Sequence, residues 1–267
     1  MSLKGKVIVV TGGTGILGGS FIDAICGAEA KVGILGRNAS VAAQRAAEIN
    51  KKGGSALALV ADVLDEAQLV AAREKILQEF GAVHGLVNAA GGNMPEGILQ
   101  PDENIFEMNL SGMQRVAELN LWGTLLPTQV FGKAIVDAGG GSIVNISSMS
   151  SQRAITKVLG YSLGKAGIDC YTKWFAVELA NRYGDKIRMN AIAPGFFLTE
   201  QNRTLLTNED NSYTQRGNLV IGHTPMKRFG IPEELNGALL WLLGEESRFV
   251  TGTIINIDGG FSTSSGV

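Results

Sequence analysis

The chain has 267 residues, of which 45% are hydrophobic and 36 are glycine, and its formal net charge is −2 at pH 7. This length suits one α/β domain over residues 1–267, and the near-neutral charge excludes general attraction to nucleic acid or an anionic membrane. No segment has the pattern of a signal peptide or a membrane span, and the two cysteines lack disulfide or zinc spacing. We therefore expect a cytoplasmic protein without a metal site.

Seven β-rich runs recur along the chain and alternate with helical patterns. Most of them are continuously apolar, as in strands buried on both faces of a parallel sheet. The runs are Lys6–Thr11, Lys31–Leu35, Ala56–Ala61, Gly85–Asn88, Ser142–Ile146, Arg188–Ile192 and Thr253–Ile257. This alternation predicts a doubly wound, Rossmann-type parallel sheet of about seven strands with helices on both faces.

A glycine-rich turn, residues 11–18, follows the first strand and precedes a helical pattern. Glycines allow a tight turn and a close approach of the backbone to a pyrophosphate, and the helix N-terminus presents free N–H groups. The turn therefore predicts dinucleotide binding. Its candidate contacts are Gly12, Thr14, Gly15, Ile16 and Gly18.

The end of the second strand bears on the choice of dinucleotide. NAD sites tend to place an acidic residue here, whereas this chain has Arg37 and no acid. A guanidinium can pair with a 2′-phosphate, so Arg37 favours NADP over NAD. The alternative is that Arg37 is a solvated charge at a strand end, which leaves NAD open.

Tyr161 and Lys165 are separated by one helical turn, and Ser148 precedes them on another segment. Positions i and i+4 share a helix face, so an ammonium at Lys165 could lower the pKa of the tyrosine from about 10. A serine hydroxyl brought to the same place could bind the oxygen of a reacting carbonyl. This pattern predicts proton transfer at a carbonyl or an alcohol.

Further segments complete a set of landmarks in chain order. They are Asp62-Val63, Asn88-Ala89-Ala90-Gly91, Asn120-Leu121-Trp122-Gly123, Asn145-Ile146-Ser147-Ser148, residues 194–199 and Asp258-Gly259-Gly260. With the glycine turn and the Tyr161/Lys165 pair, they resemble the short-chain dehydrogenase/reductase family over nearly the whole chain.

The resemblance implies reversible hydride transfer between a nicotinamide and a secondary alcohol or ketone. Tyr161 would exchange the proton, Ser148 would polarise the oxygen, Lys165 would bind the nicotinamide ribose, and Asn120 would anchor a water in a proton relay. The resemblance also implies cofactor contacts at the adenine, beside the sheet and at the nicotinamide end. These are Asp62 and Val63, then Asn88 and Gly91, then Pro194, Gly195 and Thr199, together with Tyr161 and Lys165.

Two positions depart from the family pattern. The shorter-chain branch usually has glycine where this chain has Ile16, and the glycine here stands at Gly15. Ala89 replaces an asparagine, so a hydrogen bond from that side chain is absent.

The substrate is expected to be a small anionic sugar acid. Three segments are similar to bacterial family members described as D-mannonate oxidoreductases or fructuronate reductases, and a polar segment at about 200–228 is expected to form a substrate loop. In the family, this loop and the segment between serine and tyrosine line the pocket. The candidate substrate contacts in this pocket are Arg153, Lys157, Gln201, Asn202 and Arg203.

Other functions stay open at this point. The alternatives are a gluconate or polyol dehydrogenase, a ketoacyl thioester reductase, and a non-catalytic dinucleotide sensor on the same fold. The resemblance also implies a homotetramer, and the apolar run Thr253–Ile257 would form a sheet edge of the kind that is usually covered.

Overall fold

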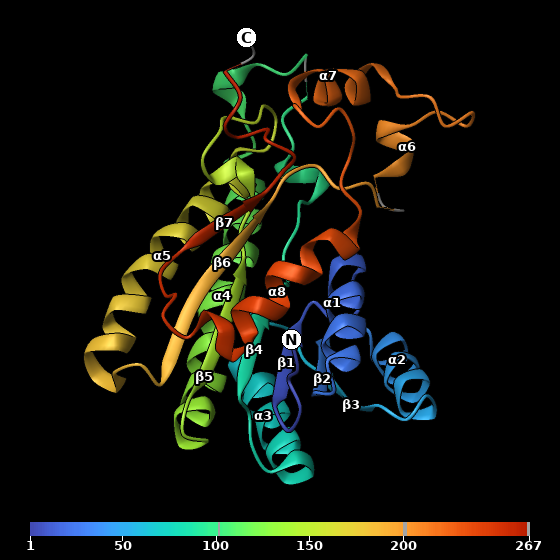
Figure 1. The fold of residues 1–267 in the computed structure, drawn as a ribbon. Coiled ribbons are helices and arrows are strands. Elements are labelled where there is room, and N and C mark those ends of the chain that lie inside the picture. The colour runs from blue at the N-terminus through green and yellow to red at the C-terminus, as the bar shows by residue number, and fades with distance from the viewer. Residues whose placement is uncertain (101, 200–201, 266–267) are drawn as a thin grey trace.

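The centre of the protein is a seven-stranded parallel sheet with the order β3-β2-β1-β4-β5-β6-β7 (Figure 1). The structure is a computed structural model, and it describes residues 1–100, 102–199 and 202–265. The strands are β1 (Val7–Thr11), β2 (Lys31–Gly36), β3 (Ser55–Val60), β4 (Gly85–Asn88), β5 (Gly141–Ile146), β6 (Ile187–Pro194) and β7 (Ile254–Ile257). The predicted doubly wound sheet is confirmed.

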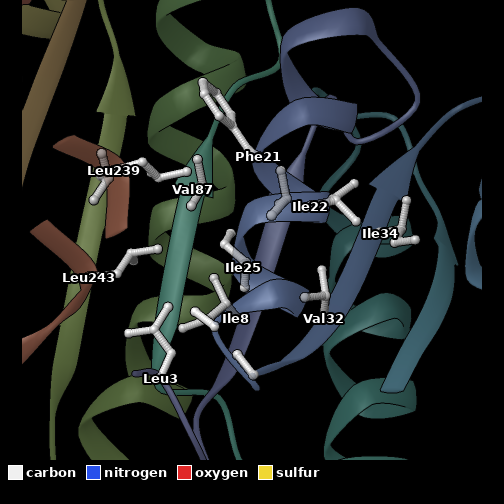
Figure 2. Close-up of a cluster of buried hydrophobic side chains, with 14 of the residues drawn as sticks. Leu3, Ile8, Phe21, Ile22, Ile25, Val32, Ile34, Val87, Leu239 and Leu243 are labelled. Carbon is white, nitrogen blue, oxygen red and sulfur yellow. The ribbon is translucent and has the colours of Figure 1, made fainter. Parts of the chain in front are cut away.

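Helices cover both faces of the sheet. They are α1 (Ile16–Gly27), α2 (Ala39–Lys51), α3 (Glu66–Phe80), α4 (Leu110–Asp137), α5 (Leu159–Tyr183), α6 (Arg203–Leu206), α7 (Gln215–His223) and α8 (Asn236–Leu243). One buried cluster joins α1, α2 and α8 to the sheet, and a second joins α3, α4 and α5 to the opposite face. Figure 2 shows the first cluster, in which Ile25 of α1 lies beside Ile8 of β1.

The apolar strand sequences explain why the sheet lies between two helical layers. Every residue of β1 and every residue of β6 is buried, as a strand covered on both faces requires. Polar side chains then fix where several helices begin. Asn38, Asp65 and Asn109 each accept a hydrogen bond from a backbone N–H in the first turn of α2, α3 and α4.

The strand order reverses between β1 and β4, because β1 pairs with β2 on one side and with β4 on the other. In an open parallel sheet, the loops at the carboxyl ends of such neighbouring strands diverge and leave a crevice. The segments after β1, β4, β5 and β6 all leave the sheet at this edge. The sequence motifs therefore meet in one place.

The polar segment expected to be a loop at 200–228 contains two short helices, α6 and α7. Leu206, Val220 and Phe229 form a small buried cluster beneath them, separate from the two main cores. Helices α6 and α7 lie together beyond one end of the sheet (Figure 1). The sequence pattern did not predict these helices, because only a few apolar residues pack beneath them and the rest of the segment is polar.

Candidate active site

Ser148 and Tyr161 meet where β5 and α5 face the crevice. Ser148 follows β5 and begins a short 3₁₀ helix, Met149–Ser151, in which its Oγ accepts a hydrogen bond from the N–H of Ser150 at 3.2 Å. Its side chain is also hydrogen-bonded to Tyr161, which lies in the first turn of α5. The structure thus brings together two hydroxyls that are thirteen positions apart in the sequence.

Lys165 lies one turn beyond Tyr161 and is buried. Its Nζ donates a hydrogen bond to the carbonyl oxygen of Ile146, the last residue of β5, at 2.7 Å. The same nitrogen lies 5.4 Å from the centre of the Tyr161 ring. The predicted placement of tyrosine, lysine and serine around one point is present.

Burial controls the protonation of this pair. It raises the pKa of Tyr161 above its ordinary value, while the hydrogen bond from Ser148 acts in the opposite direction. Burial lowers the pKa of Lys165 to about 8, and the negative charge of Asp169 acts in the opposite direction. The sequence analysis named Lys165 as the group that lowers the tyrosine pKa, whereas here Ser148 has that effect.

Asn120 is fully buried in α4 and holds the segment after β4. Its Nδ2 donates to the carbonyl oxygen of Gly92 at 2.8 Å, and the N–H of Gly92 donates to its Oδ1 at 3.1 Å. Gly91 and Gly92 have φ angles of 155° and 145°, which favour glycine. A Cβ at Gly91 would lie only 2.5 Å from Asn120 Oδ1.

The glycine-rich turn lies between β1 and α1 and packs closely on the segment after β4. Gly12 has a φ of 66°, and a Cβ there would lie 2.7 Å from the carbonyl oxygen of Ala89. A Cβ at Gly18 would lie 2.2 Å from the carbonyl oxygen of Gly12. These two positions require glycine, and α1 then starts at Ile16 beside the crevice, without a side-chain cap on its first N–H groups.

Arg45 of α2 supports this turn from behind. Its Nη1 donates hydrogen bonds to the carbonyl oxygens of Gly13 and Gly15, the second at 2.9 Å. Gly19 lies against the guanidinium, because a Cβ there would approach it to 3.0 Å. No sequence motif identified Arg45, since its partners are backbone carbonyls about thirty positions away.

A cleft of about 520 Å³ joins these parts. The predicted site residues that line it are Gly12, Thr14, Gly15, Ile16, Gly18, Arg37, Asp62, Val63, Gly91, Ser148, Tyr161, Pro194, Gly195, Thr199 and Asn202. Phe196, Phe197 and Leu119 add apolar walls that the sequence analysis did not name. A helix N-terminus, two glycines without room for a Cβ and apolar walls fit an extended dinucleotide.

Arg37 and Asp62 both line this cleft and lie beside each other. Their side chains form an ion pair at 3.7 Å, with 73% of the Arg37 side chain exposed. At this exposure the pair contributes little to stability. Arg37 therefore remains accessible to an anionic group in the cleft.

Two further predicted cofactor residues, Asn88 and Thr199, form hydrogen bonds with neighbouring parts of the protein. Asn88 is buried, and its Nδ2 donates to Thr128 of α4 and to Asn145 of β5, each at 2.9 Å. It therefore ties the sheet to α4 rather than lining the cleft. The N–H of Thr199 donates to Asn202 Oδ1 at 2.8 Å, which fixes the segment after β6.

The five predicted substrate contacts are not gathered in one place. Arg153 Nε donates to the carbonyl oxygen of Ser262 at 2.6 Å, and Arg153 lines a separate pocket of about 230 Å³ with His223. Lys157 has a φ of 75° and lies in the segment before α5. Arg203 is the first residue of α6, Asn202 lines the main cleft, and Gln201 lies outside the described residues.

Asp169 of α5 is a second buried residue that the motifs did not identify. Its carboxylate accepts hydrogen bonds from Ser147 and from Ser151, the latter at 2.6 Å. The helical spacing after Tyr161 and Lys165 carried a signal for it, because residues four apart share a face.

Neither a metal cluster nor a membrane-spanning helix belongs to the described part of the chain. No group of three or more histidine, cysteine, aspartate or glutamate side chains among those residues could hold a metal ion. Within the same ranges, no helix is both long and apolar enough to cross a bilayer.

Known proteins are similar to this chain over nearly its whole length. A family model described as enoyl-(acyl carrier protein) reductase matches residues 17–262. An uncharacterized oxidoreductase of Bacillus subtilis is 45% identical over 275 residues, which include 100% of this chain and 98% of the relative.

Two solved structures extend the comparison. One, from Haemophilus influenzae, is provisionally described as a D-mannonate oxidoreductase and has bound NAD. It has a TM-score of 0.91 and 41% identity, and the match covers 100% of this chain and 98% of that one. A gluconate 5-dehydrogenase from Burkholderia cenocepacia, in complex with NADP and tartrate, has a TM-score of 0.84 and 30% identity, with 98% and 97% covered.

The parallel sheet, the glycine turn at its switch point and the Ser148–Tyr161–Lys165 group agree with these matches. The chain belongs to the short-chain dehydrogenase/reductase family, whose members are NAD(P)-dependent oxidoreductases acting on CH–OH groups.

Proposed function

We propose that this enzyme interconverts a ketone and a secondary alcohol on a small sugar acid, with D-fructuronate and D-mannonate as the pair. The observation that carries the proposal is the hydrogen-bonded Ser148–Tyr161 pair at the cleft, with Lys165 one turn away. The structure from Haemophilus influenzae that shares 41% identity supports the choice of substrate.

In the proposed mechanism, Tyr161 donates its phenolic proton to the carbonyl oxygen, or accepts the alcohol proton in the reverse direction. Ser148 donates a hydrogen bond to the same oxygen and so stabilises the charge that develops there. Lys165 binds the ribose hydroxyls and, when charged, favours the phenolate. Asn120 keeps Gly92 in place and anchors a water for proton exchange with Lys165.

A bound nicotinamide dinucleotide supplies or accepts the hydride. Gly12, Thr14, Gly15, Ile16 and Gly18 would hold its pyrophosphate, and Asp62 and Val63 would hold its adenine. Asn88 and Gly91 support and border the middle of the site, and Pro194, Gly195 and Thr199 would hold the nicotinamide.

The preference for NADP over NAD also stays a prediction. The relatives include a structure with NAD and another with NADP. Arg37 is exposed at the cleft and could pair with a 2′-phosphate, at the cost of its contact with Asp62. If Arg37 recognises the phosphate, Arg37→Ala raises the Michaelis constant for NADPH much more than that for NADH. Equal wild-type efficiency with both cofactors would contradict this preference.

We assign the substrate to the space between the catalytic group and the segment at about 200–228. Asn202 lines the cleft, and Lys157, Gln201 and Arg203 are the other proposed contacts, whereas Arg153 lines a separate pocket. A guanidinium can bind a carboxylate with two parallel hydrogen bonds, and an ammonium can pair with it as a point charge. A fatty thioester would require a more apolar surface along these segments.

A gluconate or polyol dehydrogenase is the second candidate, because the Burkholderia cenocepacia gluconate 5-dehydrogenase covers nearly the whole chain. A turnover screen of hexonates, uronates, neutral polyols and ketoacyl thioesters with both cofactors separates the candidates. The proposal expects the highest kcat/KM with D-mannonate or D-fructuronate. Much faster turnover of a neutral polyol or an acyl thioester would reject it, and cofactor binding without any turnover would indicate a sensor.

We further propose that the chain forms a homotetramer and works in the cytoplasm. Leu163, Trp174 and Val177 share one face of α5 and are 58%, 62% and 59% exposed, and Trp122 of the neighbouring α4 is 55% exposed. Apolar side chains gathered on one face mark a protein–protein contact more often than single exposed residues do.

A further inference from the structure

Asp169 continues the helix face that carries the proposed catalytic residues. Tyr161, Lys165 and Asp169 follow one another at intervals of one turn on α5, so their side chains point to the same side. Asp169 is only 9% exposed. A carboxylate this deeply buried needs hydrogen-bond donors or an opposite charge to remain ionised.

Both oxygens of the carboxylate accept hydrogen bonds from the segment that contains Ser148. Ser147 Oγ donates to Oδ1, and Ser151 Oγ donates to Oδ2 at 2.6 Å. Ser151 Oγ also lies 2.7 Å from the carbonyl oxygen of Ser148. Asp169 therefore binds the residue immediately before Ser148 and the residue three positions after it.

Backbone hydrogen bonds also hold the segment around Ser148. The N–H of Ser147 donates to the carbonyl oxygen of Ile192 at 2.8 Å, which holds the end of β5 in the sheet. Beyond it, the turn at Ser148 is closed by the bond from the N–H of Ser151 to the carbonyl oxygen of Ser148, at 3.1 Å. The bonds to Asp169 connect this turn to the helix bearing Tyr161, beside the Ser148–Tyr161 hydrogen bond and a 3.4 Å bond from Ser147 Oγ to the carbonyl oxygen of Lys165.

We propose that Asp169 is a positioning residue that sets the distance between Ser148 and Tyr161. The carboxylate binds the Ser148 turn to α5, so that the serine hydroxyl and the tyrosine hydroxyl meet the same substrate oxygen. Hydrogen bonds to a charged acceptor are short and strong, which suits a restraint on geometry. This inference rests on the proposed function, because it assigns Asp169 through the role of Ser148.

The negative charge of Asp169 also balances that of Lys165. Its charge acts against the effect of burial on the Lys165 pKa. The carboxylate and the ammonium thus lie one turn apart on the same buried face, and each lowers the cost of burying the other.

The experiment compares Asp169→Ala and Asp169→Asn with wild type in the oxidation of D-mannonate and the reverse reaction. We expect kcat to fall about 100-fold for Asp169→Ala, as a displacement of about 1 Å can cause, while the NADH dissociation constant stays within about twofold. Asparagine can accept from one serine and donate to the other, so Asp169→Asn should recover part of the lost kcat.

A kinetic isotope effect separates positioning from loss of folded protein. With NADH deuterated at the transferred position, Asp169→Ala should show a larger isotope effect on kcat than wild type, because the slowed chemical step then limits the rate more fully. Partial unfolding would reduce the number of NADH sites and leave the isotope effect per site unchanged, which would overturn the proposal. Thr172→Val is the matched control, because it removes the buried hydrogen bond from Asn145 to Thr172 on the same helix, away from the Ser148 turn.

A double-mutant cycle tests whether Asp169 acts through Ser148. Once Ser148→Ala has removed the hydroxyl, adding Asp169→Ala should change kcat by no more than about twofold. Independent, multiplying effects of the two substitutions would overturn the inference. Should Asp169→Ala fail to fold, Ser151→Ala removes one of the same hydrogen bonds and should lower kcat by about tenfold.

The outcomes distinguish this inference from the proposed function. Full activity of Ser148→Ala would reject the catalytic assignment and the inference with it, whereas inactive Ser148→Ala beside fully active Asp169→Ala would reject the inference alone. If D-mannonate is not turned over, crystal structures of wild type and Asp169→Ala decide. The inference expects the Ser148–Tyr161 hydrogen bond to be lost in the variant, and an unchanged bond would overturn it.

Discussion

At the residue scale, the site depends on how burial treats a phenol and an ammonium. Tyr161 becomes less acidic and Lys165 becomes less basic when water is removed, so their pKa values move apart and burial favours the neutral form of each group. Ser148 opposes the change at Tyr161, and Asp169 opposes the change at Lys165. Ser148 and Asp169 therefore both act on the protonation of this pair.

Tyr161→Phe should abolish turnover while leaving NADH affinity within about twofold of wild type. The phenolic proton is essential to the proposed transfer, whereas the ring still packs beside Lys165. Steady-state rates and fluorescence titration with NADH measure the two quantities. Lys165→Ala is the comparison, because it should impair both turnover and binding. Turnover by Tyr161→Phe within about tenfold of wild type would reject the mechanism.

NADH binding should weaken as the pH rises through the pKa of Lys165, which burial lowers to about 8. Below that pH the side chain is an ammonium that can donate to ribose hydroxyls, and above it the side chain is neutral. The dissociation constant should therefore increase between about pH 7 and pH 9. Lys165→Met has no such group and should show weaker binding without this dependence. A wild-type constant that does not change over this range contradicts the proposed contact.

At the element scale, close backbone packing explains which positions of the turn between β1 and α1 must be glycine. Gly18 lies in the first turn of α1, directly against the backbone of Gly12. Arg45 of α2 binds the carbonyl oxygens of Gly13 and Gly15 on the far side. Ile16 can occupy a position that the family usually gives to glycine, because it lines the cleft rather than this contact.

Gly18→Ala should weaken dinucleotide binding at least tenfold, because the new Cβ would lie 2.2 Å from the carbonyl oxygen of Gly12 and would displace the turn. Gly27→Ala is the matched control on the same helix. It is exposed and its Cβ would meet nothing within 4 Å, so it should keep NADH affinity and gain up to about 1 kcal/mol in stability. Titration with NADH and thermal unfolding measure both variants. Normal affinity in Gly18→Ala would show that the turn tolerates the displacement.

At the scale of the whole molecule, the parallel sheet brings distant segments to one edge. The turn after β1, the glycines after β4, Ser148 after β5 and the segment after β6 all line the same cleft. Helices α6 and α7 lie beyond that end of the sheet on a small apolar cluster of their own. A separate cluster allows this part to move without disturbing the two main cores.

Light scattering at micromolar concentration should give the mass of a tetramer. The exposed apolar face of α5, with Trp174 at 62% exposure, would be covered in such an assembly. Trp174→Glu should shift the mass toward a smaller species, because a buried charge disrupts an apolar contact. Met226→Glu is the control, because Met226 is exposed in the segment after α7 and not on α5. This substitution should leave the mass unchanged. A monomer mass for wild type would remove the tetramer proposal.

The sequence by itself determined the parallel α/β fold, because apolar runs buried on both faces and regular helical stripes have a distinctive pattern. It also determined the glycine turn and the Tyr161/Lys165 pair, whose partners are close in the chain. It did not reveal α6 and α7, since a polar segment with few apolar positions resembles a loop.

Only the tertiary structure decided which distant groups control those motifs. Arg45 holds the glycine turn through backbone carbonyls, and Asp169 binds the serines around Ser148. The structure also separated Arg153 from the main cleft and paired Arg37 with Asp62. Such contacts join residues on different elements, and their existence depends on how the helices pack on the sheet. A linear pattern records spacing along one element, but it does not record which side chains from two elements meet.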